Sequence, residues 1–235
     1  MTWHDEFDGL DYDRAKWTFM YPGPSREAVN TPEAISVADG ALSIHIFSDQ
    51  GTSYSALLST LGNFETTYGY FESRIRFHNT TGNWCAFWIQ SPTIGTPMGN
   101  TAVAGTEIDV IEHRYWDYFD DLTNHMTMNL NWDGYGAGRQ NIYKHAVPPD
   151  GAPSLQDNWH TYGVLWTSAG YTFYLDDRQV WTTTTAISQR PEHLWLSCEV
   201  QGASWAGGVP PEGYGSRATS VTRMDVDWVR AWQPK

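Results

Sequence analysis

The stretch Gly69-Tyr70-Phe71-Glu72-Ser73-Arg74-Ile75-Arg76-Phe77 alternates between two kinds of side chain. Even positions carry tyrosine or charged residues, and odd positions from 71 onward carry apolar residues or serine. Successive side chains of a β-strand point to opposite faces of its sheet. This period of two therefore predicts a strand with one face in the core and the other face outside it.

Similar segments recur along the chain, at residues 42–47, 84–90, 106–112, 125–132, 160–167, 171–175, 194–200 and 222–232. Turn-forming pairs such as Asp39-Gly40 and Asp133-Gly134 separate them. No long stretch repeats with the period of a helix. About ten strands in one chain imply two packed sheets. We therefore predict an all-β protein, a β-jelly-roll sandwich of two packed antiparallel sheets, with residues 1–235 as a single domain.

Composition restricts the partners of this chain. The formal net charge is −13 and only 14 residues are Lys or Arg, so we expect no nucleic-acid partner. The acidic balance also disfavours heavily sulphated polymers. The N-terminus lacks the apolar segment of a signal peptide, and no segment has the composition of a membrane span, so we expect no membrane partner.

The segment most informative about chemistry is Gly105-Thr106-Glu107-Ile108-Asp109-Val110-Ile111-Glu112-His113. On a strand, Glu107 and Asp109 share one face. Glu112 lies an odd number of residues from Glu107, so a regular strand would bury its carboxylate among apolar side chains at a high free-energy cost. One extra residue, a β-bulge near Val110 and Ile111, would return Glu112 to the acidic face.

Such a bulge would place three carboxylates on one open face, where like charges raise one another's pKa. Two carboxyl groups about 5 Å apart are the layout of a retaining glycosidase, in which one attacks the anomeric carbon and the other protonates the leaving oxygen. Asp109 could hydrogen-bond the nucleophile. The competing interpretations are a solvated acidic strand face and a calcium site.

Aromatic residues are the second indication of a binding site. The chain has 13 tryptophans, which is many for its length. Aromatic side chains dominate both cores and binding surfaces, so we expect only part of them to meet a ligand. The candidates close to the acidic segment or to the ends of the neighbouring strands are Trp84, Trp88, Tyr115, Trp116, Trp132, Tyr135 and Trp205.

Cysteine and histidine give little evidence of a redox or metal site. Cys85 and Cys198 each lie in an apolar or aromatic run, which favours buried free thiols over a disulfide. The eight histidines include no close pair at ligand spacing, so zinc is disfavoured. Residues 134–138 alternate Gly with other residues, but no helix pattern follows, so this is not a dinucleotide-binding motif.

Several segments resemble known motifs in their order and spacing: Asp5-Glu6-Phe7-Asp8-Gly9 with Lys16-Trp17, residues 69–76, Gly82-Asn83-Trp84-Cys85-Ala86-Phe87-Trp88, the hairpin of residues 159–176, and Asp227-Trp228-Val229-Arg230-Ala231-Trp232. The acidic segment matches a signature of Glu, aliphatic, Asp, two aliphatics and Glu. Together these segments resemble glycoside hydrolase family 16, in the longer, bulged form of its signature.

This resemblance implies a single catalytic jelly-roll domain with a concave cleft that cleaves internal β-linkages with retention. It implies that Glu107 is the nucleophile, Glu112 the general acid/base and Asp109 the assisting carboxylate. Trp84 and Trp88 match positions that often line sugar subsites. No cofactor is needed for catalysis, but many members hold a structural calcium, here suggesting Gly40 and Asp227 with Glu6 nearby. We expect a secreted, extracellular or periplasmic monomer whose partner is a polysaccharide.

Some positions depart from the family pattern. Cys85 replaces a proline, and Asn129 or Asn131 occupies the place where a cleft histidine is common. These positions affect substrate choice rather than the acids. We expect an endo-glucanase acting on β-1,3- or mixed β-1,3/1,4-glucans, of the laminarinase or lichenase type. The alternatives are an endo-β-galactanase of the agarase, porphyranase or carrageenase type, a transglycosylase, and a non-catalytic carbohydrate-binding jelly roll.

Overall fold

The computed structural model describes residues 1–115, 122–202 and 206–233. Within these ranges the regular structure is almost entirely β, with one 3-10 turn, η1 (Pro32–Ala34), and one short helix, α1 (Thr101–Ala104). None of the described helices is long and apolar enough to cross a membrane.

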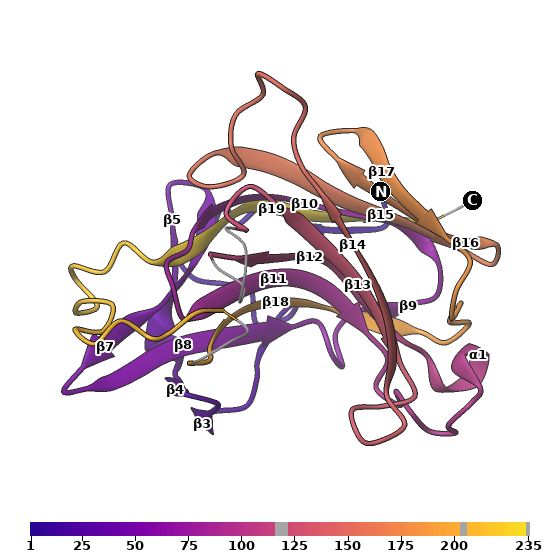
Figure 1. Cartoon of the computed structure of the whole chain (residues 1–235), viewed down its shortest axis with the longest axis horizontal. Coiled ribbons are helices and arrows are strands. Elements are labelled where there is room, and N and C mark those ends of the chain that lie inside the picture. The colour runs from indigo at the N-terminus through magenta and orange to yellow at the C-terminus, as the bar shows by residue number, and fades with distance from the viewer. Residues whose placement is uncertain (116–121, 203–205, 234–235) are drawn as a thin grey trace.

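The described strands form two sheets packed face to face (Figure 1). The first sheet has the order β17 (Arg178–Thr183), β16 (Gly170–Leu175), β15 (Trp159–Thr167), β10 (Gly69–His78), β19 (Arg223–Trp232), β6 (Ala41–His45) and β5 (Ile35–Ala38), and β1 (Trp3–Asp5) also pairs with β19. The predicted β-jelly-roll sandwich is confirmed.

The second sheet has the order β14 (Gln140–Ala146), β13 (Met126–Trp132), β12 (Glu107–Arg114), β11 (Asn83–Gln90), β18 (Glu192–Val200), β8 (Thr52–Ser59), β4 (Ala28–Asn30) and β3 (Gly23–Ser25). Three short strands extend it: β2 (Thr18–Phe19) and β7 (Phe47–Asp49) pair with β8, and β9 (Glu65–Thr66) pairs with β18. All the pairings are antiparallel except that of β4 with β8.

Strand β10 shows why the sequence forms this sandwich. Its residues alternate between buried and partly exposed along the whole strand. Phe71, Ile75 and Phe77 are at most 1% exposed and point into the core between the sheets. Its other face pairs Arg74 with Asp227, and burial of the apolar face supplies the main stabilisation.

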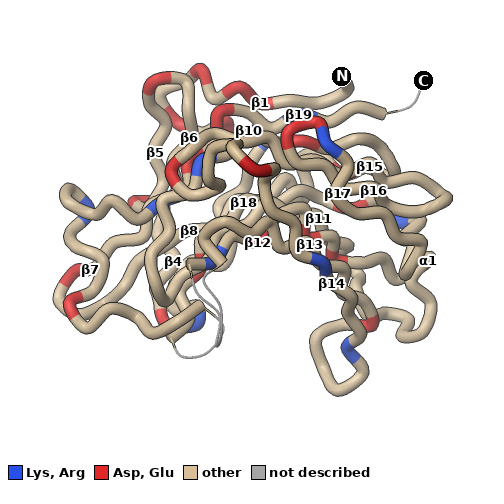
Figure 2. The backbone as a smooth tube through the Cα atoms, turned by 45° about the horizontal axis from the view of Figure 1, so that its top comes forward, with Lys and Arg blue, Asp and Glu red and all other residues tan. Residues whose placement is uncertain are grey.

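The core face of the second sheet comes from the strands that carry the chemistry. Alternate residues of β11, β13 and β18, together with Ile108, Val110 and Ile111 of β12, pack against the first sheet. Their other residues therefore face outward on the opposite side of the same sheet. Figure 2 shows that side as the concave underside of the arch, and shows Lys and Arg positions scattered rather than gathered.

The prediction of free thiols is wrong. Cys85 of β11 and Cys198 of β18 are direct register partners, with their Cα atoms 4.1 Å apart, and they form a disulfide. Both side chains are fully buried, as the sequence suggested. What the sequence could not supply was the register of β11 on β18, which joins two residues separated by 113 positions.

Candidate active site

A β-bulge in β12 brings the three acids to one face. Along β11, Phe87 pairs with Ile111 and the next residue, Trp88, pairs with Asp109, so Val110 has no opposite residue. The same extra residue appears in the register between β12 and β13. The predicted bulge is confirmed, and it restores the outward direction of Glu112 without placing its carboxylate in the apolar core.

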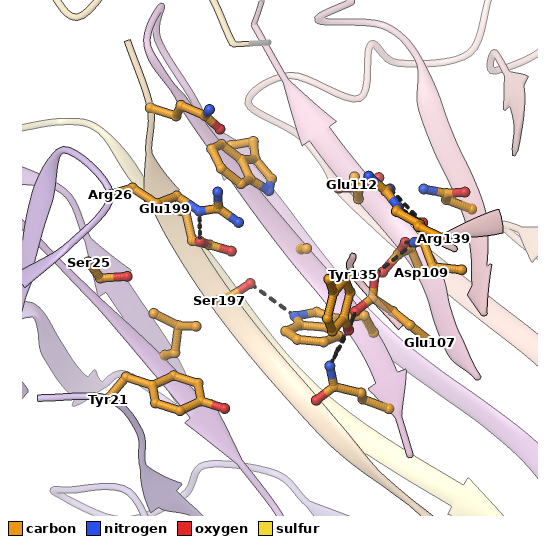
Figure 3. Close-up of a pocket in the computed structure, with 18 residues that line it drawn as sticks. Tyr21, Ser25, Arg26, Glu107, Asp109, Glu112, Tyr135, Arg139, Ser197 and Glu199 are labelled. Atoms are coloured by element: carbon orange, nitrogen blue, oxygen red, sulfur yellow. Dashed lines mark hydrogen bonds and ion pairs between the residues drawn. The ribbon is translucent and has the colours of Figure 1, made fainter. Parts of the chain in front are cut away.

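The strand register arranges the outward residues in rows across the cleft. Glu107 lies between Gln90 of β11 and Asn131 of β13. Asp109 lies between Trp88 and Asn129, and Glu112 lies between Ala86 and Thr127. These residues, apart from Thr127, line one cavity of about 660 Å³ (Figure 3). Four residues that were predicted to bind substrate are therefore in the lining of this cavity: Trp88, Asn129 and Asn131 from these rows, and Trp84.

Asn131 links two of the acids. Its Nδ2 donates to Glu107 Oε1 at 2.7 Å and to Asp109 Oδ2 at 3.1 Å. Its Oδ1 accepts a hydrogen bond from Arg139 Nε at 3.0 Å, which leaves only the NH₂ group to face the carboxylates. The sequence predicted a hydrogen bond from Asp109 to the nucleophile, but here an asparagine side chain bridges the two acids.

The acids have raised pKa values because their surroundings disfavour negative charge. Burial raises the pKa of Glu112 to about 7; Arg114 opposes the shift, and the charges of Glu107 and Glu199 add to it. Burial, followed by the charges of Glu107 and Glu112, raises the pKa of Asp109 well above its usual value. Burial also raises the pKa of Glu107, against a hydrogen bond from Tyr135 that lowers it.

Trp88 and Tyr21 form an aromatic floor of the cleft beside the acids, and both stack on Trp195, which is buried beneath the surface. Trp88 stacks on Trp195 with ring centroids 4.8 Å apart, and Tyr21 stacks on the same indole at 5.8 Å. Trp88 Nε1 donates to Ser197 Oγ at 3.0 Å, which fixes the plane of its ring. An extended apolar surface beside acids is suited to the faces of sugar rings.

A cationic group lies on the other side of this floor. The guanidinium of Arg26 lies 5.0 Å above the Trp84 ring, and its Nε donates to Glu199 Oε2 at 2.5 Å. Figure 3 shows Arg26 and Glu199 across the cleft from Glu107, Asp109 and Glu112. Trp84, which was predicted to line a sugar subsite, therefore has an arginine over one face of its ring.

Trp132 does not line the cavity, and two other predicted tryptophans lie outside the described residues. On β13 the odd positions 127, 129 and 131 face the cleft, whereas Trp132 packs against the hydrophobic core. Trp116 and Trp205 belong to segments that the structure does not describe. Tyr135, one of the aromatic candidates from the sequence, also lines the cavity, whereas the lining residues Tyr21, Arg26, Gln90, Arg139 and Glu199 were not predicted.

The residues predicted to hold calcium do not fit a divalent cation. Asp227 Oδ2 accepts a hydrogen bond from Arg74 Nη1 at 2.6 Å. Glu6, the other nearby carboxylate, is bound by Arg230 at 2.8 Å. Gly40 lies in the turn between β5 and β6, where it could offer only backbone oxygen. A guanidinium at each carboxylate would repel a cation, and the described residues contain no cluster of three or more candidate ligands.

This arrangement can carry out acid-base and nucleophilic chemistry. It offers one carboxylate with three hydrogen-bond donors, a second carboxyl that holds a proton near neutral pH, and an aromatic floor between the loops. An acid and a nucleophile with different surroundings on one cleft face form the pair that glycoside cleavage requires.

Comparisons with known proteins agree with this geometry. A family model described as "Beta-porphyranase A-D, GH16 domain" matches residues 2–234. Endo-1,3-1,4-beta-glycanase ExsH of Rhizobium meliloti is 28% identical over 222 residues, covering 90% of this chain and 42% of that protein. A beta-glucanase of Rhodothermus marinus is 27% identical, covering 99% of this chain and 85% of that protein.

Among solved structures, the catalytic domain of an endo-1,3-beta-glucanase (laminarinase) from Thermotoga petrophila has a TM-score of 0.77 and 25% identity, covering 100% of this chain and 97% of that chain. The chain spans about two fifths of the length of the first curated relatives that it matches. The similarity therefore extends over nearly the whole chain, but only over part of those relatives.

Proposed function

The chain belongs to glycoside hydrolase family 16, and on this basis we propose that it is a retaining, endo-acting hydrolase of internal β-glycosidic bonds in a polysaccharide. The observation that carries the proposal is the bulged β12 strand. It aims Glu107, Asp109 and Glu112 into one aromatic-floored cavity and leaves one of the three with a pKa of about 7.

In the proposed reaction, Glu107 attacks the anomeric carbon as Glu112 gives its proton to the leaving glycosidic oxygen. The bond between the anomeric carbon and that oxygen breaks, and a glycosyl ester forms on Glu107. Glu112, now ionised, takes a proton from a water molecule that attacks the same carbon, which releases Glu107. Two displacements leave the anomeric configuration unchanged.

Asp109 and Asn131 support both displacements in this proposal. Asp109 has a strongly raised pKa, so it is a proton-bearing neighbour that limits the negative charge around the nucleophile. Asn131 Nδ2 donates to both acids and holds them at a fixed separation. Exchange of Asn131 for an acid would crowd a further charge into the same row.

The first substrate candidate is a β-1,3- or mixed β-1,3/1,4-glucan. Its support is that curated relatives covering nearly the whole chain carry the names of endo-1,3-1,4-beta-glycanases and beta-glucanases. Trp88 and Tyr21, which both line the cavity and stack on the buried Trp195, offer an apolar floor that suits uncharged sugar rings.

The second substrate candidate is a galactan, such as agarose, porphyran, carrageenan or a galactose-containing host glycan. The family model that matches the chain carries a description that names beta-porphyranases. Arg26 and Arg139 also line the cavity, so the cleft contains cationic groups although the whole chain is acidic. A guanidinium can bind an anionic substituent with paired hydrogen bonds.

A panel of polymers separates these candidates. We would incubate the protein with laminarin, mixed-linkage β-glucan, agarose, porphyran and carrageenan and measure new reducing ends. Glu107→Gln is the inactive comparison, and Glu212→Gln, at an exposed position that does not line the cavity, is the matched control. Oligosaccharides from a glucan with wild type and Glu212→Gln alone would support the first candidate.

Other outcomes have definite meanings. Products from a galactan alone would keep the mechanism and replace the substrate. Longer chains appearing when oligosaccharide acceptors are added would indicate a transglycosylase. Binding to a polymer without cleavage would refute the hydrolase and favour a non-catalytic carbohydrate-binding jelly roll. Polysaccharides are too large to cross a membrane intact, so the proposal includes a secreted protein that works outside the cell or in the periplasm. It also includes that the protein is a monomer.

A further inference from the structure

Tyr135 reaches the nucleophile from a turn rather than from the sheet. It lies in the connection between β13 and β14, directly after Asp133 and Gly134, which both have positive φ, 62° and 78°. Two such residues in succession form a tight reversal that an Asp-Gly pair adopts readily. The residue is 55% exposed, but its hydroxyl points inward to Glu107 (Figure 3).

A second loop braces this turn. The backbone N–H of Gly99 donates to Asp133 Oδ1 at 2.7 Å. Gly95 lies so close to the turn that a Cβ atom on it would be 2.6 Å from the Cα of Gly134. Gly138, which follows Tyr135, packs against the end of the Met98 side chain from the same loop. The long segment between β11 and β12 therefore fixes where Tyr135 can lie.

The contacts converge on one oxygen of Glu107. Its Oε2 accepts hydrogen bonds from the Tyr135 hydroxyl and from Gln90 Nε2, the latter at 3.3 Å. Gln90 also donates to the Tyr135 hydroxyl oxygen, which leaves the phenolic hydrogen for the carboxylate. Oε1 is bound separately by Asn131. The tyrosine thus determines the orientation of the oxygen that Asn131 does not hold.

The charges around Glu107 make this donor important. The acidic groups coupled to it are Asp109 and Glu112 on its own strand and Glu199 and Glu192 on β18. The cationic group is Arg139 from the β13–β14 side. Burial, together with the neighbouring acids when they are ionised, favours the protonated form of Glu107, which cannot act as a nucleophile, and the Arg139 guanidinium opposes this.

We propose that Tyr135, held by the braced turn, is a positioning residue that orients the carboxylate of Glu107 and stabilises its ionised form. This inference rests on the proposed function, in which Glu107 is the nucleophile. Burial and the charge of Glu107 raise the pKa of the Tyr135 hydroxyl, so the phenol keeps its proton and remains a donor at every pH at which the enzyme would work. The hydroxyl is the part of this side chain that matters, rather than the ring.

The test is Tyr135→Phe, which keeps the ring and removes the hydroxyl. Tyr143→Phe is the matched control, because Tyr143 is 61% exposed on β14 and does not line the cavity. Glutamate labelled with ¹³C at the side-chain carboxyl would be titrated by NMR, with Glu107→Gln assigning the signal. We expect the Glu107 midpoint to rise by about one pH unit in Tyr135→Phe and to stay unchanged in Tyr143→Phe.

Kinetics on the polymer that the enzyme cleaves give a second readout. We expect kcat of Tyr135→Phe to fall about tenfold at pH 5 with KM changed less than about twofold, and the acid limb of the pH profile to move upward. An unchanged Glu107 midpoint would overturn the proposal, as would a loss expressed in KM alone, since that would make Tyr135 a sugar platform.

The two readouts keep the proposals apart. The NMR titration needs no turnover, so it reports on Tyr135 even if no polymer is cleaved. If the wild type cleaves no polymer but the Glu107 midpoint is raised in Tyr135→Phe, the hydrolase proposal is refuted and the effect of Tyr135 on Glu107 is retained. Cleavage of a polymer by the wild type, with a Glu107 midpoint that is unchanged in Tyr135→Phe, would support the hydrolase proposal and refute the role of Tyr135.

Discussion

Both sheets have a β-bulge in a central strand, but the carboxylates beside the two bulges have different surroundings. In β19 the bulge is at Asp227, and Asp227 and the nearby Asp225 are paired with arginines. In β12 the bulge is at Val110, and Glu112 Oε2 is buried without a hydrogen-bond partner.

The difference shows in how readily each group ionises. Burial opposes ionisation of Asp225, but hydrogen bonds from His78, Ser43, Arg76 and Arg223 outweigh it and lower its pKa. Burial of Glu112 is not offset in this way, and its pKa is about 7. Carboxylates with cationic partners stabilise the first sheet. The second sheet instead holds carboxyl groups whose ionisation is unfavourable, and a carboxyl group that keeps its proton near neutral pH is useful for proton transfer.

The largest effect that the comparison predicts is on activity. Glu112→Gln should lower kcat on the cleaved polymer by at least about a thousandfold, because an amide cannot donate the proton that the leaving oxygen needs. Asp227→Asn on the first sheet should leave kcat within about twofold. Initial rates of the two variants measure this, and substantial activity in Glu112→Gln would break the contrast between the sheets.

The same variant should be more stable than wild type in alkaline solution. The folded-state pKa of Glu112 is raised, so its contribution to stability is present below its ordinary pKa and is lost as pH rises through about 7. We expect Glu112→Gln to increase the free energy of unfolding at pH 8 by about 2 kcal/mol and to change it little at pH 4. Urea denaturation at the two pH values tests this, and equal effects at both would contradict it.

The pH dependence of catalysis follows from the same group. Glu112 must carry a proton for the first displacement, so kcat/KM should fall as pH rises through about 7. The midpoint of this alkaline decrease in kcat/KM belongs to the coupled acids together rather than to Glu112 alone. A rate that keeps rising to pH 9 would show that the general acid is another group.

On the first sheet the expected effect is on stability with the opposite sign. Asp225→Asn should cost about 2 kcal/mol, because Arg76, Arg223 and His78 would lose a buried anion that all three contact. The depressed pKa of Asp225 means that its stabilisation is present above its ordinary pKa and is lost as pH falls through the folded-state value. Activity per folded molecule should be unchanged, and a stable but inactive variant would contradict the assignment of roles.

The smallest expected effect concerns metal removal. Because arginines bind both Asp227 and Glu6, EDTA should shift the melting temperature by less than about 1 °C. A scan with and without added calcium measures this. A shift of several degrees on calcium addition would show that the cation displaces Arg74 and would restore the calcium prediction from the sequence.

The sequence predicted those features that follow from the parity of a strand. The alternation over residues 69–77 predicted β10, and the odd spacing between Glu107 and Glu112 predicted the bulge. The same parity rule places Trp132 in the core, since it is an even position on a strand whose odd positions face the cleft. The prediction that Trp132 contacts a sugar gave more weight to its aromatic type than to its even position on the strand.

The remaining site residues depend on register and loops, which one sequence does not determine. Cys85 meets Cys198 because of strand pairing across more than a hundred residues. Tyr135, Arg139 and Arg26 reach the cavity from turns or strand ends, where no period constrains direction. The sequence signal for Tyr135 was its type and position, an aromatic residue between two glycines and four residues after Asn131.

The most direct test of the central claim, that the carboxylates of β12 perform double displacement, is the anomeric configuration of the first product. Proton NMR during the first minutes of hydrolysis of the cleaved polymer distinguishes the two anomers at the new reducing end. We predict that the β-anomer appears first and then mutarotates, and that Glu107→Gln gives no product. Initial release of the α-anomer would mean inversion by a single displacement and would contradict the role of Glu107 as nucleophile.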